Sequence, residues 1–232
     1  MKKLLVFLCT MSFIFGMAAS AMAVPTTLYD ILGYEGTQAY YDTGAEYVFL
    51  TDTDGTNDDA TAFLFLEDAS FKDANIFGIY DFTVEGDVVS KGDQLQIFAG
   101  MDSEPTSATV TFDIAAGTAS YGGSTANIDT TFGFYLTDFY QNTYYSHAAL
   151  NQDQFDHMMI FDTSDNLVGG LLGSDAVIAI EDLWGGGDTD FNDMVVGIND
   201  VSPVPEPATM LLLGSGLIGL AGLGRKKFFK KS

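Results

Sequence analysis

Residues 181–198 read Glu-Asp-Leu-Trp-Gly-Gly-Gly-Asp-Thr-Asp-Phe-Asn-Asp-Met-Val-Val-Gly-Ile. The three glycines predict a turn that accepts positive φ, and the apolar residues 194–198 indicate a buried strand behind it. Acidic and amide side chains crowd the bend between them. Such a loop suits Ca²⁺, which takes about 6–8 oxygen ligands. We therefore expect a calcium loop on a β scaffold, with these candidate ligands: Glu181, Asp182, Asp188, Asp190, Asn192 and Asp193.

The spacing of these acids begins like an EF-hand loop and then departs from it. Asp193 stands at the sixth position, where that loop needs glycine, and Asn199 stands at the twelfth, where it needs a bidentate glutamate. The flanking residues predict strands instead of helices. An EF-hand is therefore excluded, and a polar β-turn with solvated acids is the alternative to a calcium loop.

The same segment resembles the carboxy-terminal signature of the DUF4114 family. The shared pattern is an acidic-aromatic lead-in, a Gly-Gly-Asp turn, Asp-x-Asp-aromatic-Asn-Asp and a hydrophobic strand, all within residues 181–198. The resemblance implies a β-rich domain of a secreted bacterial protein, in a family suspected of binding calcium. His157 resembles a histidine that often precedes this signature in the family.

The amino terminus predicts a secretory signal peptide over residues 1–23. A basic start precedes a short apolar run, and Ala21 and Ala23 fit a small-x-small cleavage site. Cys9, the one cysteine, lies inside this segment. The mature chain is therefore expected to form no disulfide and no cysteine-based site.

The carboxy terminus combines a Pro-Glu-Pro triplet, a short apolar span and a basic tail. Together they resemble the PEP-CTERM sorting signal, which implies processing by an exosortase-type enzyme in a Gram-negative bacterium. The protein would then pass from an inner-membrane intermediate to the cell surface or the extracellular space. The expected parts are a linker at 201–207 that contains Pro205, Glu206 and Pro207, a transmembrane sorting helix at 208–224 and a basic cytoplasmic tail at 225–232.

Charge is sorted strongly along the chain. Between Val24 and Val204 there are 31 acidic residues and two basic ones, Lys72 and Lys91, so this part carries a net charge of −29. Such a domain repels nucleic acid and anionic membranes. Aromatic residues make up 13% of the chain and hydrophobic residues 47%, which favours a folded core over disorder.

Residues 24–200 predict one all-β domain. About ten short strands alternate with turns rich in Gly, Asp and Asn, and no convincing amphipathic helix interrupts them. We expect an antiparallel β-sandwich of jelly-roll type, with an immunoglobulin-like topology as the alternative. Residues 201–204 contain no further strand in this interpretation.

A second acidic cluster follows the first predicted strand. It is expected to form a turn, either as a second metal site or as a solvated hairpin tip. Its candidate ligands are Asp52, Asp54, Asn57, Asp58 and Asp59.

The remaining motifs leave several functions open. His157 is either a structural hydrogen-bonding residue or a neighbour of the metal, and Tyr144 and Trp184 are either packing residues or platforms for a sugar ring. No catalytic motif was found in the sequence, although paired carboxylates also occur in glycosidases. We therefore expect a non-catalytic, calcium-stabilised component of the extracellular matrix or envelope, with a carbohydrate-binding module for exopolysaccharide as the alternative and a glycan hydrolase as a third candidate.

Overall fold

The computed structural model describes residues 42–53, 57–66, 74–100, 102, 106–164 and 174–205. Thirteen strands and two short 3₁₀ helices lie in this part of the chain. In chain order they are β1 (Ala45–Leu50), β2 (Asn57–Leu66), β3 (Ile76–Glu85), β4 (Val88–Phe98), β5 (Thr106–Asp113), β6 (Thr118–Tyr121), β7 (Ser124–Ala126), β8 (Thr131–Thr137), β9 (Thr143–Tyr145), η2 (Ala148–Leu150), β10 (Met158–Asp162), β11 (Ala176–Ile180), η3 (Trp184–Gly186), β12 (Met194–Ile198) and β13 (Val201–Pro205).

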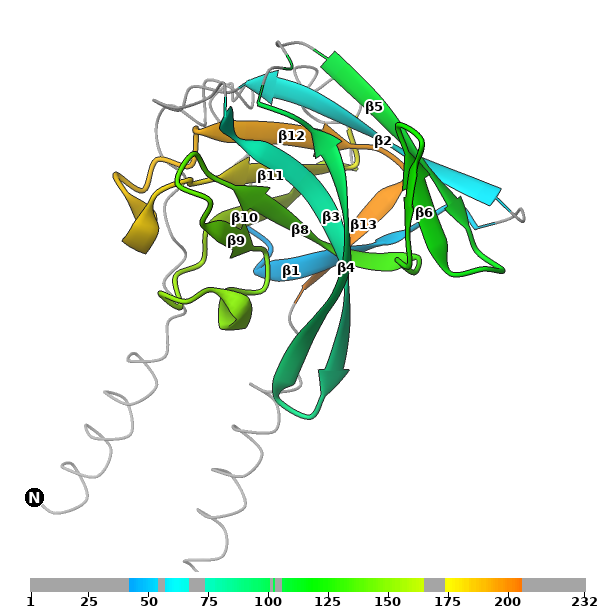
Figure 1. The fold of residues 1–232 in the computed structure, drawn as a ribbon, viewed down its shortest axis with the longest axis horizontal. Coiled ribbons are helices and arrows are strands. Elements are labelled where there is room, and N and C mark those ends of the chain that lie inside the picture. Colours follow the sequence, from blue (N-terminus) through cyan, green and yellow to red (C-terminus); the bar gives the residue numbers. More distant parts are fainter. Residues whose placement is uncertain are drawn as a thin grey trace, which may run out of the picture.

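The strands form two antiparallel sheets that pack face to face (Figure 1). One sheet has the order β13-β1-β8-β3-β4, with β9 paired to β8, and the other has the order β10-β11-β12-β2-β5-β6-β7. The prediction of an all-β sandwich is confirmed. Strands from the two ends of the sequence are neighbours, since β13 pairs with β1 and β12 pairs with β2.

Aromatic side chains from both sheets fill the space between them. Phe112 of β5 stacks on Phe132 of β8 with 5.2 Å between ring centroids, which joins the two layers. Phe77 and Phe134 extend this contact and are fully buried. Strand β5 alternates buried and exposed residues as its sequence predicts, because one face meets the core and the other faces solvent.

The second half of the signature segment is the strand β12, and it lies inside a sheet. It pairs with β11 on one side and with β2 on the other. Every residue of β11 and of β12 is buried, as their nearly continuous apolar sequences predict. The loop that connects these two strands, residues 181–193, is therefore anchored at both ends in the most buried part of the fold.

The first five residues of the predicted linker 201–207 form a strand instead of a linker. Val201–Pro205 forms the edge strand β13, and Val201 and Pro203 face inward. The valines and the alternation with Ser202 suit a strand, and the two prolines are tolerated because β13 has a partner on one side only. Residues 206 and 207 lie outside the described part of the chain.

Several other expected features fall outside the described residues. They are the signal peptide at 1–23 with Ala21 and Ala23, residues 167–172, which were expected to form one of the short strands, the sorting helix at 208–224 and the basic tail at 225–232. Within the described ranges, none of the helices has the length and apolar character needed to cross a bilayer.

Candidate metal centre

The β11–β12 loop brings its first and last acids together because the strands that flank it are hydrogen-bonded neighbours. Ile180 at the end of β11 pairs with Met194 at the start of β12. Directly beyond this pair, the Asp182 amide donates a hydrogen bond of 2.9 Å to the Asp193 carboxylate. Residues 181–193 therefore form a closed loop at one side of the sandwich, drawn in gold in Figure 1.

Five of the six predicted ligands converge in two overlapping groups. Carboxylate oxygens of Glu181, Asp188 and Asp190 lie within 4.8 Å of one another, and so do those of Glu181, Asp182 and Asp193. Glu181 belongs to both groups. The sixth residue, Asn192, donates its side-chain amide to Asp190 at 2.7 Å and so holds that carboxylate in place.

Unusual backbone angles give the loop its shape. The three glycines have φ values of +72°, +83° and +44°, and Thr189 and Phe191 also have positive φ, at +60° and +54°. A non-glycine residue in this region costs about 1 kcal/mol or more, so other contacts must hold the loop. Phe191 supplies one such contact, because its ring is buried and stacks beside Phe155 at 6.4 Å.

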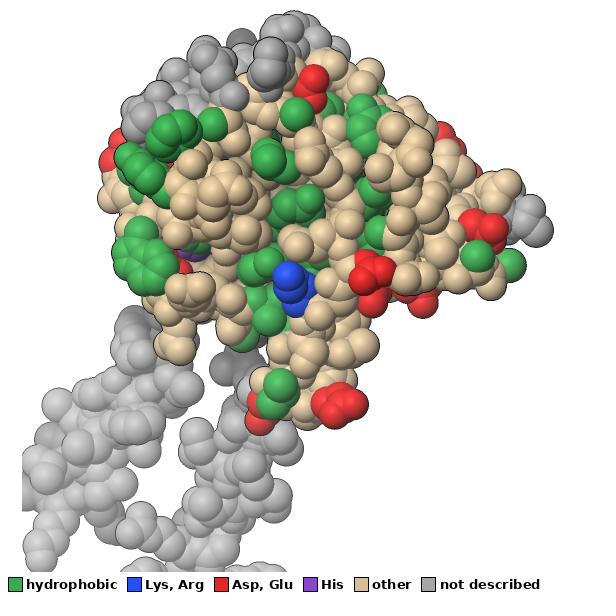
Figure 2. Space-filling view, in the orientation of Figure 1, with side chains coloured by type: hydrophobic (Ala, Val, Ile, Leu, Met, Phe, Trp, Pro, Cys, Tyr) green, Lys and Arg blue, Asp and Glu red, His purple; other side chains and the backbone are tan. Residues whose placement is uncertain are grey.

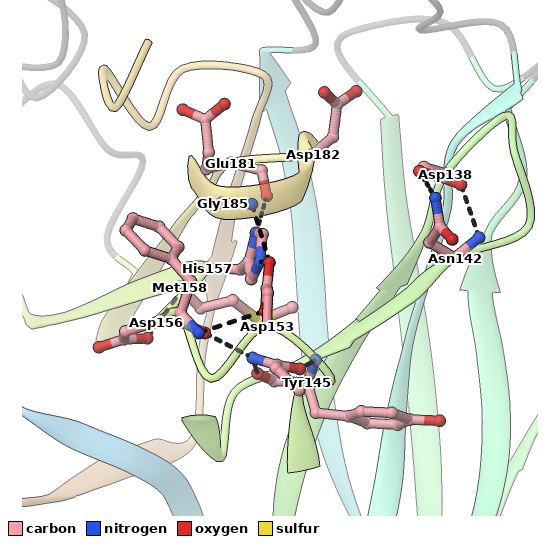
Figure 3. A network of polar contacts seen from close by, with 12 residues as sticks. Asp138, Asn142, Tyr145, Asp153, Asp156, His157, Met158, Glu181, Asp182 and Gly185 are labelled. Atoms are coloured by element: carbon pink, nitrogen blue, oxygen red, sulfur yellow. Dashed lines mark hydrogen bonds and ion pairs between the residues drawn. The ribbon is translucent and has the colours of Figure 1, made fainter. Parts of the chain in front are cut away.

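Gly187 is required by a close approach as well as by its backbone. A Cβ atom at this position would collide with a carboxylate oxygen of Glu181. Because Gly187 has no side chain, the Glu181 carboxylate can occupy the space next to its α-carbon position in the loop. Figure 3 shows the side chains of Glu181 and Asp182 on the far side of the η3 turn from Asp153.

Glu181 is the most unusual group of the loop. Its side chain is 0% exposed, and neither carboxylate oxygen has a hydrogen-bond partner of acceptable distance and angle, although Asp193 and the Phe191 backbone lie close by. Burial, followed by the charge of Asp193, raises its pKa to about 8. Burial also raises the pKa of Asp193, to about 6. The fold thus holds several acids together without a counter-charge, since no ion pair between described residues reaches them.

A second layer of residues supports the loop from below. The His157 ring is 0% exposed; its Nδ1 lies 2.8 Å from the Glu181 carbonyl oxygen and its Nε2 lies 3.0 Å from the Asp153 carboxylate. Both partners are acceptors, so both ring nitrogens donate when the ring is protonated. The same Asp153 oxygen accepts a hydrogen bond of 2.8 Å from the Gly185 amide (Figure 3). Both His157 nitrogens are engaged in these bonds, so in this arrangement the residue supports the loop from its backbone side.

Two of the residues that support the loop, Asp153 and Asn75, could not be identified from the sequence. Asp153 and Asn75 stand in segments with no motif, and Asn75 donates a hydrogen bond of 2.9 Å to the Asp182 carboxylate. Each reaches the loop from more than 25 positions away, because Asn75 precedes β3 and Asp153 precedes β10. Only the topology of the sheets brings them there.

The second acidic cluster, within residues 52–59, does not have the structure that we predicted for it. Residues 52–59 were expected to form one turn, but β2 already begins at Asn57, and Asp58 and Asp59 pair across to Phe112 and Thr111 of β5. Successive strand residues face opposite sides of a sheet, so these two acids diverge. Among the described residues, no three carboxylates of this cluster converge as closely as in the β11–β12 loop, and Asp54 lies outside those residues.

One acid near this cluster was missed by the sequence analysis. Burial, followed by the charges of Asp175, Asp59, Asp52 and Asp58, raises the pKa of Asp200. Asp200 lies in the turn between β12 and β13, so the second cluster extends to the far end of β12.

The other candidate residues are placed as follows. Trp184 lies in η3 and is exposed, and Tyr144 lies in β9 and is buried with its ring 3.9 Å from that of His157. Pro205, the first residue of the Pro-Glu-Pro triplet, ends β13 and pairs with Ala45 of β1.

Comparison with protein families finds two matches. Residues 109–200 match the family model described as a domain of unknown function, DUF4114, and residues 203–226 match the PEP-CTERM protein-sorting motif. Both resemblances inferred from the sequence are confirmed. Neither the curated proteins nor the solved structures contain a significant match to the chain.

The sorting motif carries the functional information in these matches. It implies an exported protein of a Gram-negative bacterium that passes through a membrane-anchored intermediate and is processed by an exosortase-type enzyme on its way to the cell surface. The chain therefore matches the DUF4114 family model over residues 109–200 and the PEP-CTERM sorting motif directly after it, over residues 203–226.

Proposed function

We propose that the protein is a non-catalytic component of the cell surface or extracellular matrix, and that its β11–β12 loop binds one Ca²⁺ ion. The observation that carries the metal site is the buried Glu181 carboxylate, whose two oxygens have no hydrogen-bond partner of acceptable distance and angle and which lies among four further carboxylates. A buried charge without a partner costs several kcal/mol, so an ion or a proton must compensate it. The sorting motif supports the surface location.

The donor set favours calcium over other metals. All converging groups are carboxylates, and no nitrogen or sulfur ligand from the residues that the structure describes joins them, which disfavours zinc and copper. Magnesium keeps several of its waters and is usually held by one or two carboxylates, whereas Ca²⁺ accepts many oxygens in flexible geometry. The ligands would be Glu181, Asp182, Asp188, Asp190 and Asp193, with Asn192 orienting Asp190.

The geometry gives little support to a hydrolase. Retaining and inverting glycosidases need two carboxyl groups that face a substrate cleft. In the described part of the chain, the converging acids surround a fully buried glutamate, and no carboxylate lines the surface groove beside Trp184. A scaffold or binding role is therefore the better proposal.

Calorimetric titration of the purified full chain with Ca²⁺ tests the metal site. We expect one site with a Kd of roughly 10⁻⁴–10⁻³ M, as in other extracellular modules. At about 100 times this Kd, calcium should add about 2.7 kcal/mol to the free energy of unfolding. Glu181→Gln should abolish both effects, while Asp87→Asn, which changes an exposed acid in the β3–β4 turn, should change neither. Equal binding by wild type and Glu181→Gln would reject this site.

A further inference from the structure

A groove lies beside the metal loop, between three segments that are distant in the sequence. Residues 141–145 form one wall, Leu150 at the end of η2 and Gln152 form another, and Trp184 of η3 closes the side next to the loop. Its volume is about 280 Å³, just below the range of about 300–1,000 Å³ for ligand pockets. In Figure 2 this part of the molecule, at the left, shows a protruding hydrophobic side chain beside a hollow.

The chemistry of the groove differs from that of the rest of the surface. The chain has a formal net charge of −23, yet none of the described residues that line the groove carries a charged side chain. Its lining offers amides, a hydroxyl group and aromatic rings, which include Gln141, Asn142, Thr143, Tyr144, Gln152 and Trp184. A ligand that fits must be neutral, must carry hydrogen-bonding groups and must have an apolar face. A sugar ring has all three properties.

Trp184 presents its indole to solvent on a rigid support. The side chain is 58% exposed, although aromatic rings of this size are usually well covered. The turn that carries it is held by the Gly185 amide, which donates to Asp153, and by the Gly186 amide, which donates to the Leu183 carbonyl at 2.9 Å. An aromatic platform that is already fixed loses little entropy when a ligand stacks on it.

The opposite walls are fixed as well. Asn151 is buried and joins them: its side chain accepts a hydrogen bond of 2.7 Å from the Tyr145 amide and donates to the Tyr145 and Phe155 carbonyls at 3.0 and 2.9 Å. Asp138 accepts hydrogen bonds of 2.7 and 2.8 Å from the backbone and side-chain amides of Asn142 (Figure 3). The groove is therefore preorganised by hydrogen bonds at its sides and by the stacked Tyr144 and His157 rings at 3.9 Å beneath.

We propose that this groove binds one sugar unit of a neutral polysaccharide, with Trp184 stacking on the ring and the amides of Gln141 and Gln152 bonding to its hydroxyls. This proposal gives the surface protein of the previous section a ligand class, and it rests on that surface role but not on the metal. Anionic polysaccharides are disfavoured, because the surrounding acids repel them.

The chain offers a specific probe for this site, because Trp184 is its only tryptophan. The full chain, in a detergent without a sugar headgroup, is titrated with neutral gluco-, manno- and galacto-oligosaccharides and with polygalacturonate as an anionic comparison. Tryptophan fluorescence reports binding at the groove, and calorimetry repeats each titration. We expect at least one neutral oligosaccharide to bind and to change the fluorescence.

Two variants test whether the oligosaccharide binds in the groove. Trp184→Ala should weaken the binding of that oligosaccharide by about tenfold or more in calorimetry, as expected for a central aromatic contact. Phe49→Ala removes an exposed aromatic ring from β1, outside the groove, and should leave the affinity unchanged. Circular dichroism and the unfolding temperature verify that both variants fold.

The outcomes separate the two proposals. No binding by any neutral oligosaccharide, binding of polygalacturonate alone, or equal affinity for wild type and Trp184→Ala would each overturn the groove proposal. A calcium titration without sugar reports on the loop separately. If sugar binds and calcium does not, the groove proposal stands and the metal proposal fails; if calcium binds and no sugar does, the reverse holds.

Discussion

Glu181 shows how a single residue reveals a site that its neighbours in sequence do not. The chain has 32 acidic residues, so closeness of two acids carries little information. Glu181 differs because its carboxylate is fully buried, has no hydrogen-bond partner of acceptable distance and angle, and occupies the space that a side chain at Gly187 would need. Its charge therefore has to be neutralised by a proton or by a cation, and the two alternatives depend on pH in opposite ways.

The pH dependence of stability distinguishes these alternatives. The folded pKa of Glu181 is raised from 4.5 to about 8, so the folded chain retains a proton that the unfolded chain loses. In chelator, this group stabilises the fold fully below pH 4.5, and its contribution falls as the pH rises from about 4.5 to about 8. Asp193, whose pKa is raised to about 6, acts in the same direction over a narrower range. In saturating calcium the loss should disappear, because the ion replaces the proton.

Denaturant unfolding at several pH values between 5 and 8 measures this effect. The quantity to compare is the difference in the free energy of unfolding between wild type and Glu181→Gln. Distant groups that titrate, such as the buried His147, contribute equally to both proteins and drop out of this difference. In chelator, this difference should change with pH by a few kcal/mol at most, with the wild type losing stability towards pH 8. A difference that is constant over this range would contradict the proton-bound state of Glu181.

At the scale of elements, the strands of the fold follow from the sequence more closely than the site does. Local patterns in the sequence indicate these strands. The apolar runs of β11 and β12 match strands that are buried on both faces, and the alternation of β5 matches a strand that is buried on one face. The acids of the β11–β12 loop were also recognisable, because the glycines mark the turn and the strands on both sides hold its ends together. The edge strand β13 was missed, since its prolines suggest a linker and only pairing with β1 makes it a strand.

Two supporting residues of the site, Asp153 and Asn75, have no such local signal, whereas His157 was recognised only through its resemblance to a histidine of the family. His157 and Asp153 reach the loop through the pairing of β10 with β11, and Asn75 reaches it from before β3. The positive φ angles of Thr189 and Phe191 are equally hidden, because these residue types usually avoid that region. Tertiary contacts impose these features, so no pattern within a short window of sequence predicts them.

The turn of the loop allows two glycines to be compared directly. Gly185→Ala and Gly187→Ala both place a side chain at positive φ, but a Cβ at Gly185 meets open space, whereas a Cβ at Gly187 meets Glu181 and Leu183. We expect Gly185→Ala to cost about 1 kcal/mol and to leave calcium affinity nearly unchanged. Gly187→Ala should destabilise the chain by roughly twice as much or more, because φ of +44° with ψ of −121° suits glycine alone and because the new methyl group displaces Glu181.

Denaturant unfolding and calcium titration of both variants measure these changes. The Kd for calcium should rise by about tenfold or more in Gly187→Ala, the equivalent of at least about 1.4 kcal/mol. Equal calcium affinities of the two variants would show that Glu181 does not need its present position to bind the ion.

At the scale of the whole molecule, the matched family region does not form the sandwich by itself. The match covers residues 109–200, yet β2 lies between β12 and β5, and β1 and β3 flank β8. The amino-terminal strands therefore complete both sheets of the matched region. The sorting motif begins in the last strand of the same sandwich, since the match from residue 203 includes the end of β13.

The metal loop and the groove are parts of one connected structure. Asp153 holds the turn that carries Trp184, and His157 links Asp153 to the backbone of Glu181 while its ring supports Tyr144. An ion bound at Glu181 should strengthen the hold of these contacts on the turn, and so restrain the platform for the sugar further than the hydrogen bonds alone do. Coupling between two sites is reciprocal, so a sugar should also strengthen calcium binding by the same factor.

We therefore expect the affinity for the oligosaccharide identified with Trp184 fluorescence to rise by about fivefold or more between chelator and saturating calcium, the lower end of typical coupling between sites. Asp153→Asn keeps the size of the side chain but removes the charge that holds His157 and the Gly185 amide, so it should reduce this factor while both ligands still bind. Asp87→Asn, far from both sites, should retain the full factor. The same sugar affinity with and without calcium in the wild type would mean that the loop and the groove act independently, because a rigid turn that is already fixed without the ion leaves nothing for the ion to order.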